Sequence, residues 1–124
     1  MALTGYYFDT YAFYELLYQN TNYTQFSKNV KFITSKLNLM ELYYGLLCKF
    51  GKETAESYYN RFMRYCVDID DEVIKQAMVF KSLNKKRRLS YVDCIGYILA
   101  RSKGLKFLTG DKEFESFDNV EFVK

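Results

Sequence analysis

The sequence predicts a three-layer α/β domain, in which a mainly parallel sheet of about four to five strands lies between two layers of helices. Short segments rich in aromatic and β-branched residues alternate along the chain with longer segments whose apolar residues recur at helical spacing. Of the 124 residues, 49% are hydrophobic and 27% are charged, which is typical of a folded chain with an ordinary core. We therefore expect a single domain over residues 1–124.

The first half of the chain shows the pattern strand, helix, strand, helix, helix. Between the first helix and the second strand lies a polar connection rich in asparagine and threonine, at residues 20–24. Thr34 or Ser35 can cap the long helix that follows, and Gly51 lies where a left-handed C-cap is expected. The predicted elements are a strand at 5–9, a helix at 11–18, a strand at 30–34, and helices at 36–50 and about 53–64.

The second half continues the alternation. Three acidic residues open a helix at residue 70, and a basic cluster closes it near residue 84, as the helix dipole favours. Because right-handed crossovers cover the two faces in turn, the alternating strands imply a parallel sheet. The predicted elements are a strand at 65–69, helices at 70–84 and 90–103, a strand at 105–108, a helical turn at 111–117 and a strand at 120–123.

Composition excludes several classes of chemistry. The chain has no histidine, which removes Ser-His-Asp catalysis and histidine-bound zinc or haem. Cys48, Cys66 and Cys94 are widely spaced and odd in number, so they fit neither a disulfide framework nor a zinc motif. No export signal or membrane span is recognisable, and we expect a cytoplasmic protein without a membrane partner.

Four carboxylates stand alone between apolar residues: Asp9, Glu41, Asp93 and Asp111. An ionised carboxylate is costly to bury unless it is paired or binds a metal, and the sequence near these four offers no obvious cationic partner. Asp9 and Asp111 each follow a predicted strand, and parallel sheets bind ligands beyond the carboxyl ends of their strands. Converging carboxylates suit a hard divalent ion, so we expect a Mg²⁺ or Mn²⁺ site.

Helix capping is the alternative interpretation for most of these acids. Ser90 and Asp93 have the spacing of a capping box, Asp9 or Thr10 can cap the first helix, and Asp111 can cap the last helical turn. Glu41 lies beyond the first turn of its helix, where the helix dipole no longer accounts for it. Taken together, the four positions favour the metal site over capping alone.

A basic segment precedes the helix that contains Asp93. Two interpretations stay open for Lys85, Lys86, Arg87 and Arg88: they complement the end of a helix, or they bind phosphate groups next to the acidic residues. The chain also contains 13 tyrosines and 11 phenylalanines, most of which must fill the core because tryptophan is absent.

These segments together resemble the PIN domain, and the size is similar to that of the VapC-type toxin ribonucleases of prokaryotic toxin-antitoxin pairs. The matching segments are residues 8–10, 40–46, 89–93 with Ala100, and 108–114. In that family these positions hold four metal-binding acids, here Asp9, Glu41, Asp93 and Asp111, with hydroxyl groups such as Thr10, Thr109 and Ser90 in support.

The resemblance implies a Mg²⁺- or Mn²⁺-dependent endoribonuclease, usually a homodimer, that a small antitoxin protein neutralises by covering the active site. Three alternatives stay open: a PIN-fold nuclease of RNA processing or decay outside a toxin pair, a non-catalytic interaction module, and a phosphohydrolase of small phosphoesters.

Overall fold

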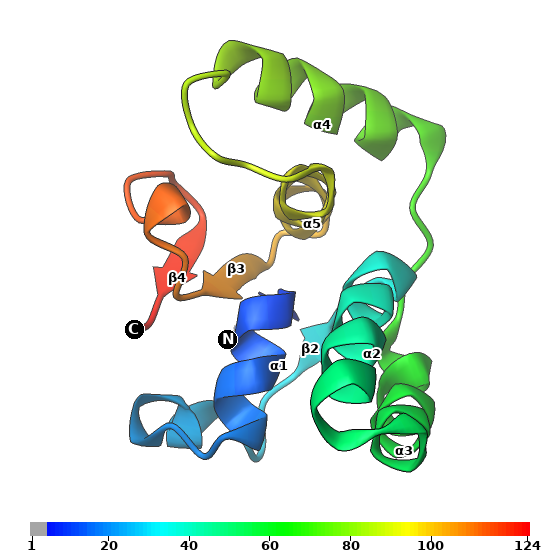
Figure 1. Ribbon diagram of the computed structural model, residues 1–124. Coiled ribbons are helices and arrows are strands. Elements are labelled where there is room, and N and C mark those ends of the chain that lie inside the picture. Colours follow the sequence, from blue (N-terminus) through cyan, green and yellow to red (C-terminus); the bar gives the residue numbers. More distant parts are fainter. Residues whose placement is uncertain (1–4) are drawn as a thin grey trace.

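The computed structural model describes residues 5–124 and, apart from a strand predicted at 65–69, shows strands and helices in the expected order (Figure 1). The strands are β1 (Tyr6–Phe8), β2 (Phe32–Ile33), β3 (Lys106–Thr109) and β4 (Val120–Phe122). The α-helices are α1 (Thr10–Leu17), α2 (Lys36–Phe50), α3 (Lys52–Phe62), α4 (Asp71–Leu83) and α5 (Tyr91–Ser102). Short 3₁₀ helices lie at η1 (Thr21–Phe26), η2 (Met63–Tyr65) and η3 (Lys112–Phe114). No helix of this part of the chain is both long and apolar enough to cross a membrane.

The four strands form one parallel sheet in the order β2-β1-β3-β4. Tyr7 of β1 is paired with Ile33 on one side and with Phe107 on the other. The first strand therefore lies inside the sheet, next to a strand that is about a hundred residues away in sequence. This arrangement confirms the predicted α/β class.

Helices cover both faces of the sheet, and each face has its own hydrophobic core. Tyr6 and Phe8 pack in the core beneath α1, α2 and α3, whereas Tyr7 packs on the opposite face against α5, with α4 outside it. Figure 1 shows α4 and α5 on one side of the sheet and α1, α2 and α3 on the other. The alternation of successive side chains between faces is the expected property of a strand buried on both sides.

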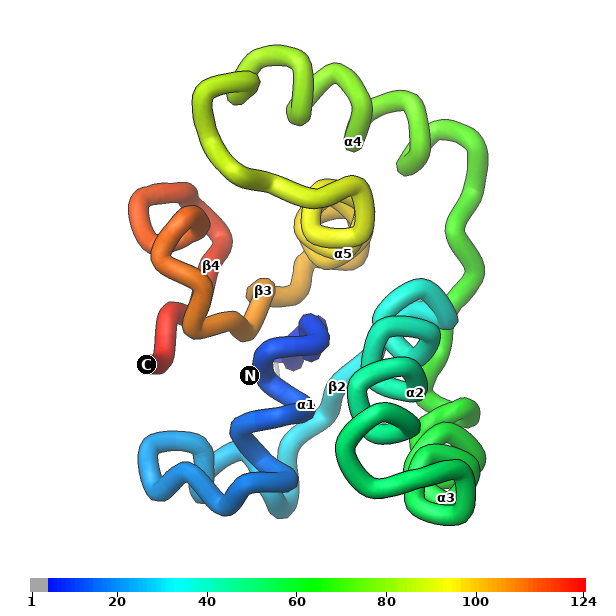
Figure 2. Tube along the Cα trace, viewed as in Figure 1, coloured from blue at the N-terminus to red at the C-terminus, as the bar shows by residue number. Residues whose placement is uncertain are grey.

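The predicted strand at 65–69 is wrong. Tyr65 ends η2, and only Cys66 pairs with the sheet, as a single bridge to Thr34. Cys66 packs in the core of the α1–α3 face, but Val67 and Ile69 pack in the core of the α4–α5 face. The segment therefore crosses from one layer to the other and cannot continue along the edge of β2; Figure 2 shows it running from α3 to α4.

Two details differ from the predicted loops. The polar connection at 20–24 contains most of η1, because the aromatic side chains of Tyr23 and Phe26 are buried against the sheet's core and fix this segment. Gly51 has a positive φ of 95°, but its ψ of 175° lies outside the left-handed helical region. It ends α2 and at once begins α3, so the two helices meet without a loop.

Candidate metal and substrate site

The carboxyl ends of β1 and β3 place two of the predicted ligands at the same edge of the sheet. Asp9 follows β1 directly, and Asp111 lies two residues beyond β3. Since β1 and β3 are neighbouring parallel strands, both residues emerge at the carboxyl edge. From β1 the chain continues to β2 on one side of it, and β3 lies on its other side. The carboxyl edge between β1 and β3 is therefore the point at which the strand order reverses, and open parallel sheets bind ligands at such a switch point.

Asp9 is a buried carboxylate, with only 4% of its side chain exposed. Its Oδ1 accepts a hydrogen bond of 3.1 Å from the backbone N–H of Ala12 and so caps α1. No lysine or arginine of residues 5–124 forms an ion pair with it. The pKa of Asp9 is raised to about 7: burial is the largest cause and the nearby charge of Asp93 adds to it, while hydrogen bonds from Thr109 and Ala12 oppose the rise.

Asp93 begins α5 within a capping box. Its Oδ2 accepts from the Ser90 backbone N–H at 3.2 Å, and the Ser90 hydroxyl accepts from the Asp93 N–H at 3.0 Å. Burial raises the pKa of Asp93, and the charges of Asp111 and Glu41 add to this rise. Asp93 therefore faces each of the other three predicted ligands closely enough to interact with its charge.

Glu41 is held by a chain of hydrogen bonds that crosses from the core to the site. The Thr10 hydroxyl donates to Glu41 Oε1 at 2.6 Å, and the Asn38 amide donates to the Thr10 hydroxyl at 3.1 Å. The carbonyl oxygen of the Asn38 side chain accepts from the hydroxyls of Tyr7 and Ser35. Buried Asn38 is a supporting residue that sequence reasoning missed; its position three residues before Glu41, on the same helical face, was the available signal.

Asp111 caps the 3₁₀ helix η3. Its Oδ1 accepts from the Glu113 backbone N–H at 3.0 Å, while its own N–H donates to the buried Thr109 hydroxyl at 3.1 Å. The capping interpretation is therefore correct for Asp9, Asp93 and Asp111. For Asp9 and Asp111 the capping bond is made by one carboxylate oxygen, Oδ1.

The donor chemistry of the site fits a hard divalent cation. Carboxylates and the hydroxyls of Thr10 and Thr109 come together at this edge, with neither imidazole nor thiolate among the ligands considered. However, no three acidic or cysteine side chains within residues 5–124 are gathered closely enough to hold one metal ion. The four carboxylates are electrostatic neighbours in an open arrangement, in which mutual repulsion opposes closer approach.

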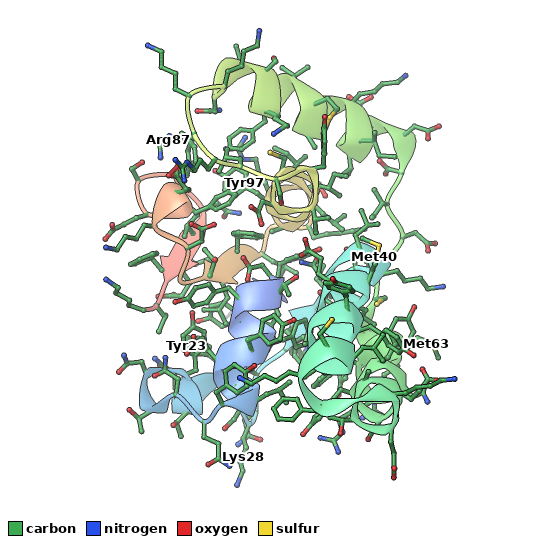
Figure 3. The ribbon with its side chains drawn as sticks, in the orientation of Figure 1. Tyr23, Lys28, Met40, Met63, Arg87 and Tyr97 are labelled. Carbon is green, nitrogen blue, oxygen red and sulfur yellow. The ribbon has the colours of Figure 1, made fainter. Side chains whose placement is uncertain are left out.

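The basic segment divides into one anchored and three exposed residues. Arg87 donates to the Glu113 carbonyl oxygen at 2.8 Å and to the Ser116 hydroxyl at 3.0 Å, and its guanidinium lies 4.5 Å from the centre of the Phe117 ring. Figure 3 shows Arg87 against the C-terminal turn. Lys85, Lys86 and Arg88 are exposed. The Arg87 side chain thus docks the α4–α5 loop on the turn that follows Asp111, next to the acidic edge.

Comparison with known families identifies the chain. Its sequence matches the PIN domain family over residues 6–120. The chain belongs to the PIN domain family. No curated protein matches the sequence of this PIN domain.

Solved structures with the same fold include toxins of toxin-antitoxin pairs. VapC20 of Mycobacterium tuberculosis, described as a sarcin-ricin loop cleaving toxin, has a TM-score of 0.79 at 20% identity, and the match covers 97% of this chain and 100% of the VapC20 chain. DNA-bound VapBC from Salmonella typhimurium has a TM-score of 0.72 at 20% identity, with 97% of each chain covered. A toxin-antitoxin complex from Klebsiella pneumoniae has a TM-score of 0.74 at 17% identity, covering 94% of this chain and 96% of the other. These similarities confirm the PIN fold.

Proposed function

We propose that this PIN domain is a metal-dependent endoribonuclease and the toxin of a toxin-antitoxin pair. The observation that carries the proposal is Asp9: a buried carboxylate without a cationic partner among residues 5–124, in electrostatic contact with a second acid at the switch point of the sheet. Burying such a charge is costly, and a bound divalent ion compensates for it.

Asp9, Glu41, Asp93 and Asp111 would hold the ion, which we propose to be Mg²⁺ or Mn²⁺. When bound, the ion supplies Lewis acidity toward water and positive charge beside the phosphate. The protein's own groups orient the ligands: the Thr10 hydroxyl holds Glu41, Ser90 holds Asp93, and Thr109 holds the backbone of Asp111. Burial of Asp9 excludes bulk water from its side of the site.

The proposed reaction is hydrolysis of an RNA phosphodiester bond by water. The chain has no histidine to activate a ribose hydroxyl, so we expect products with a 5′-phosphate and a 3′-hydroxyl. The exposed residues Lys85, Lys86 and Arg88 would hold phosphates flanking the cleaved bond, since their loop is docked next to Asp111.

The partner proposed is a small antitoxin protein that covers the active site. Support comes from the matched structures, which include a toxin-antitoxin complex and VapBC complexes with the same fold. We also propose that the domain forms a homodimer, which light scattering after size-exclusion chromatography measures directly.

The decisive experiment combines metal binding with cleavage. Calorimetric titration of Mg²⁺ and Mn²⁺ into the wild type should show binding, and a structured RNA should be cleaved whereas p-nitrophenyl phosphate should not. Asp9→Asn removes a ligand charge and should abolish cleavage while circular dichroism shows a folded domain. Asp71→Asn, which changes an exposed acid at the start of α4, is the matched control and should retain activity. Full activity in EDTA, or in Asp9→Asn, would contradict the proposal.

A further inference from the structure

Three tyrosines line one face of α1 next to the acidic site. Tyr11, Tyr14 and Tyr18 are spaced by three and four residues, which places them on the same side of the helix. Together with Glu15 and Gly45 of α2 they line a cavity of about 350 Å³. This volume lies within the range of sites that bind small molecules or single building blocks of polymers.

The cavity adjoins the candidate metal site. The Tyr14 hydroxyl donates to the backbone carbonyl oxygen of Glu41 at 3.3 Å. Tyr11 directly follows Thr10, whose hydroxyl holds the Glu41 carboxylate, and the charges of Asp111 and Asp9 reach the Tyr11 hydroxyl. A ligand that enters the cavity would therefore extend from the acidic residues along α1.

Gly45 lets the Tyr14 ring lie directly against α2 at the wall of the cavity. A Cβ atom at this position would lie 1.6 Å from the Tyr14 hydroxyl, so any larger residue would displace the tyrosine. Tyr14 and Tyr18 stack on each other with ring centres 6.0 Å apart and planes inclined by 17°. Tyr18 is 47% exposed, whereas Tyr11 and Tyr14 are half-buried and pack in part against the core of the α1–α3 face. The Tyr18 ring is therefore the one most open to a ligand.

A positive charge marks the far end of the cavity. The Lys49 ammonium of α2 lies 4.4 Å from the centre of the Tyr18 ring and 3.3 Å from its hydroxyl oxygen. From Tyr11 to Tyr18 the helix rises about 10 Å. Along this line lie the acidic residues of the candidate site, then the tyrosine rings with the Glu15 carboxylate beside them, and then a cation. This order matches an RNA strand that has its reacting phosphate at the candidate metal site. The next base would then lie against the tyrosine rings, and the following phosphate would lie near Lys49.

We propose that this groove, the tyrosine groove (Tyr11, Tyr14, Tyr18, Gly45 and Lys49), binds unpaired nucleobases of the RNA strand on one side of the cleaved phosphate. A base stacks on the Tyr14–Tyr18 face, and Lys49 contacts the phosphate that follows. Bases in a duplex are paired and cannot reach the rings, so the groove selects single-stranded or looped RNA. The inference rests on the proposed function for what occurs at the acidic residues.

Binding without cleavage provides the test. Fluorescence anisotropy in EDTA compares a short single-stranded oligoribonucleotide with an abasic oligomer of equal length. Stacking on an aromatic side chain is strong enough that Tyr18→Ala should weaken binding of the base-containing oligomer by roughly fivefold to hundredfold. The same variant should leave binding of the abasic oligomer within about twofold. Tyr18→Phe retains the ring and should restore the affinity for bases.

Lys49→Ala should weaken the binding of both oligomers, because it removes a phosphate contact. Lys103→Ala, at the end of α5, is the matched control and should leave both affinities unchanged. Equal binding by Tyr18→Ala and wild type, an equal loss for both oligomers, or no binding of RNA by the wild type would each overturn the inference.

The failure of this inference is distinguishable from the failure of the proposed function. If Asp9→Asn abolishes cleavage but Tyr18→Ala binds normally, only the tyrosine groove is wrong; if cleavage is metal-independent but base binding needs Tyr18, only the nuclease mechanism is wrong.

Discussion

Asp9 caps helix α1 through one carboxylate oxygen, and this bond alone does not compensate for the burial of a full charge. The N–H of Ala12 and the Thr109 hydroxyl stabilise the ionised form, yet the pKa of Asp9 is still raised to about 7. The same residue therefore caps the first helix and supplies the buried charge that we propose attracts a cation.

This raised pKa predicts a pH-dependent stability of the metal-free protein. The unfolded chain holds Asp9 at its ordinary value of 3.8, so the folded state binds an extra proton between about pH 4 and pH 7. The free energy of unfolding must then fall as pH rises through that interval. We expect Asp9→Asn to gain stability relative to the wild type between pH 5 and pH 8 by about 2 kcal/mol, measured by urea unfolding in EDTA.

Asp118→Asn is the control for that measurement. Asp118 is an exposed acid whose pKa is lowered by Tyr97 and Arg101, so it is ionised throughout pH 5 to pH 8 in both states. Its replacement should shift stability by a constant amount over this range. An Asp9→Asn curve parallel to the wild type would show that Asp9 is not protonated on folding.

The contacts of Arg87 lead to a second prediction about a single residue. Its guanidinium contacts the Glu113 carbonyl, the Ser116 hydroxyl and the Phe117 ring. Arg87→Ala should therefore destabilise the protein by about 1 to 2 kcal/mol in urea unfolding. Lys86→Ala, one position earlier and exposed, should change stability by less than about 0.5 kcal/mol. Equal stability of the two variants would contradict the anchoring role of Arg87.

Three of the four acidic residues lie at the N-terminal ends of helices. Asp9, Asp93 and Asp111 lie at the starts of α1, α5 and η3, at the end of the sheet where parallel strands terminate. Glu41 lies further along α2 and reaches the site through Thr10. Capping and ligand binding are thus compatible, because each carboxylate has two oxygens and the caps fix their directions.

The capping box of α5 can be tested through its hydroxyl. Ser90→Ala removes the acceptor for the Asp93 N–H and should cost about 1 kcal/mol of stability. Bonds from Ser90 also stabilise the ionised form of Asp93, so the pKa of that carboxyl should rise further and Mg²⁺ affinity near neutral pH should decrease. Ser90→Thr retains a capping hydroxyl and should restore both stability and calorimetric metal affinity; a failure of restoration would indicate that the hydroxyl acts by another route.

Local patterns in the sequence were sufficient to predict most of the helices and strands. Periodicity, capping residues and lone charges are local, and they correctly predicted α2, α5 and the strands that precede Asp9 and Asp111. The spacing of Asn38 from Glu41 was visible in the sequence, but its hydrogen bonds were not, because its partners Tyr7, Ser35 and Thr10 meet only after β1, α1 and α2 have packed. The strand predicted at 65–69 failed for a similar reason, since the segment's composition favours a strand but its neighbours lie on opposite faces of the sheet.

At the scale of the whole molecule, the sheet order assembles the site from both ends of the chain. The loop of Lys85 and Lys86 reaches the acidic edge because Arg88 and Arg87 bind the turn after Asp111. The surface that we propose for RNA therefore has basic residues on one side of the acids and the tyrosine groove on the other.

The salt dependence of RNA binding tests this layout. Each phosphate contact releases counterions, so a Lys85→Ala, Lys86→Ala double variant should reduce the slope of log affinity against log salt by roughly 1.4 units for single-stranded RNA. Metal affinity should stay unchanged, because neither lysine contacts the acids. An unaltered slope would mean that the basic loop is only a solvated helix end and that phosphates bind elsewhere.

The pairing of β1 with β3 also determines when the protein can act during its synthesis. Strand β1 emerges from the ribosome first, but the neighbour that carries Thr109 and leads to Asp111 is translated about a hundred residues later. Until then, the aromatic side chains of β1 lack half of their packing partners, and the fourth carboxylate does not exist. Folding is therefore delayed until late in translation, as expected for a sheet closed by distant contacts. If the proposed function is correct, an incomplete nascent chain cannot cleave the RNA around it, and a prematurely terminated chain is inert.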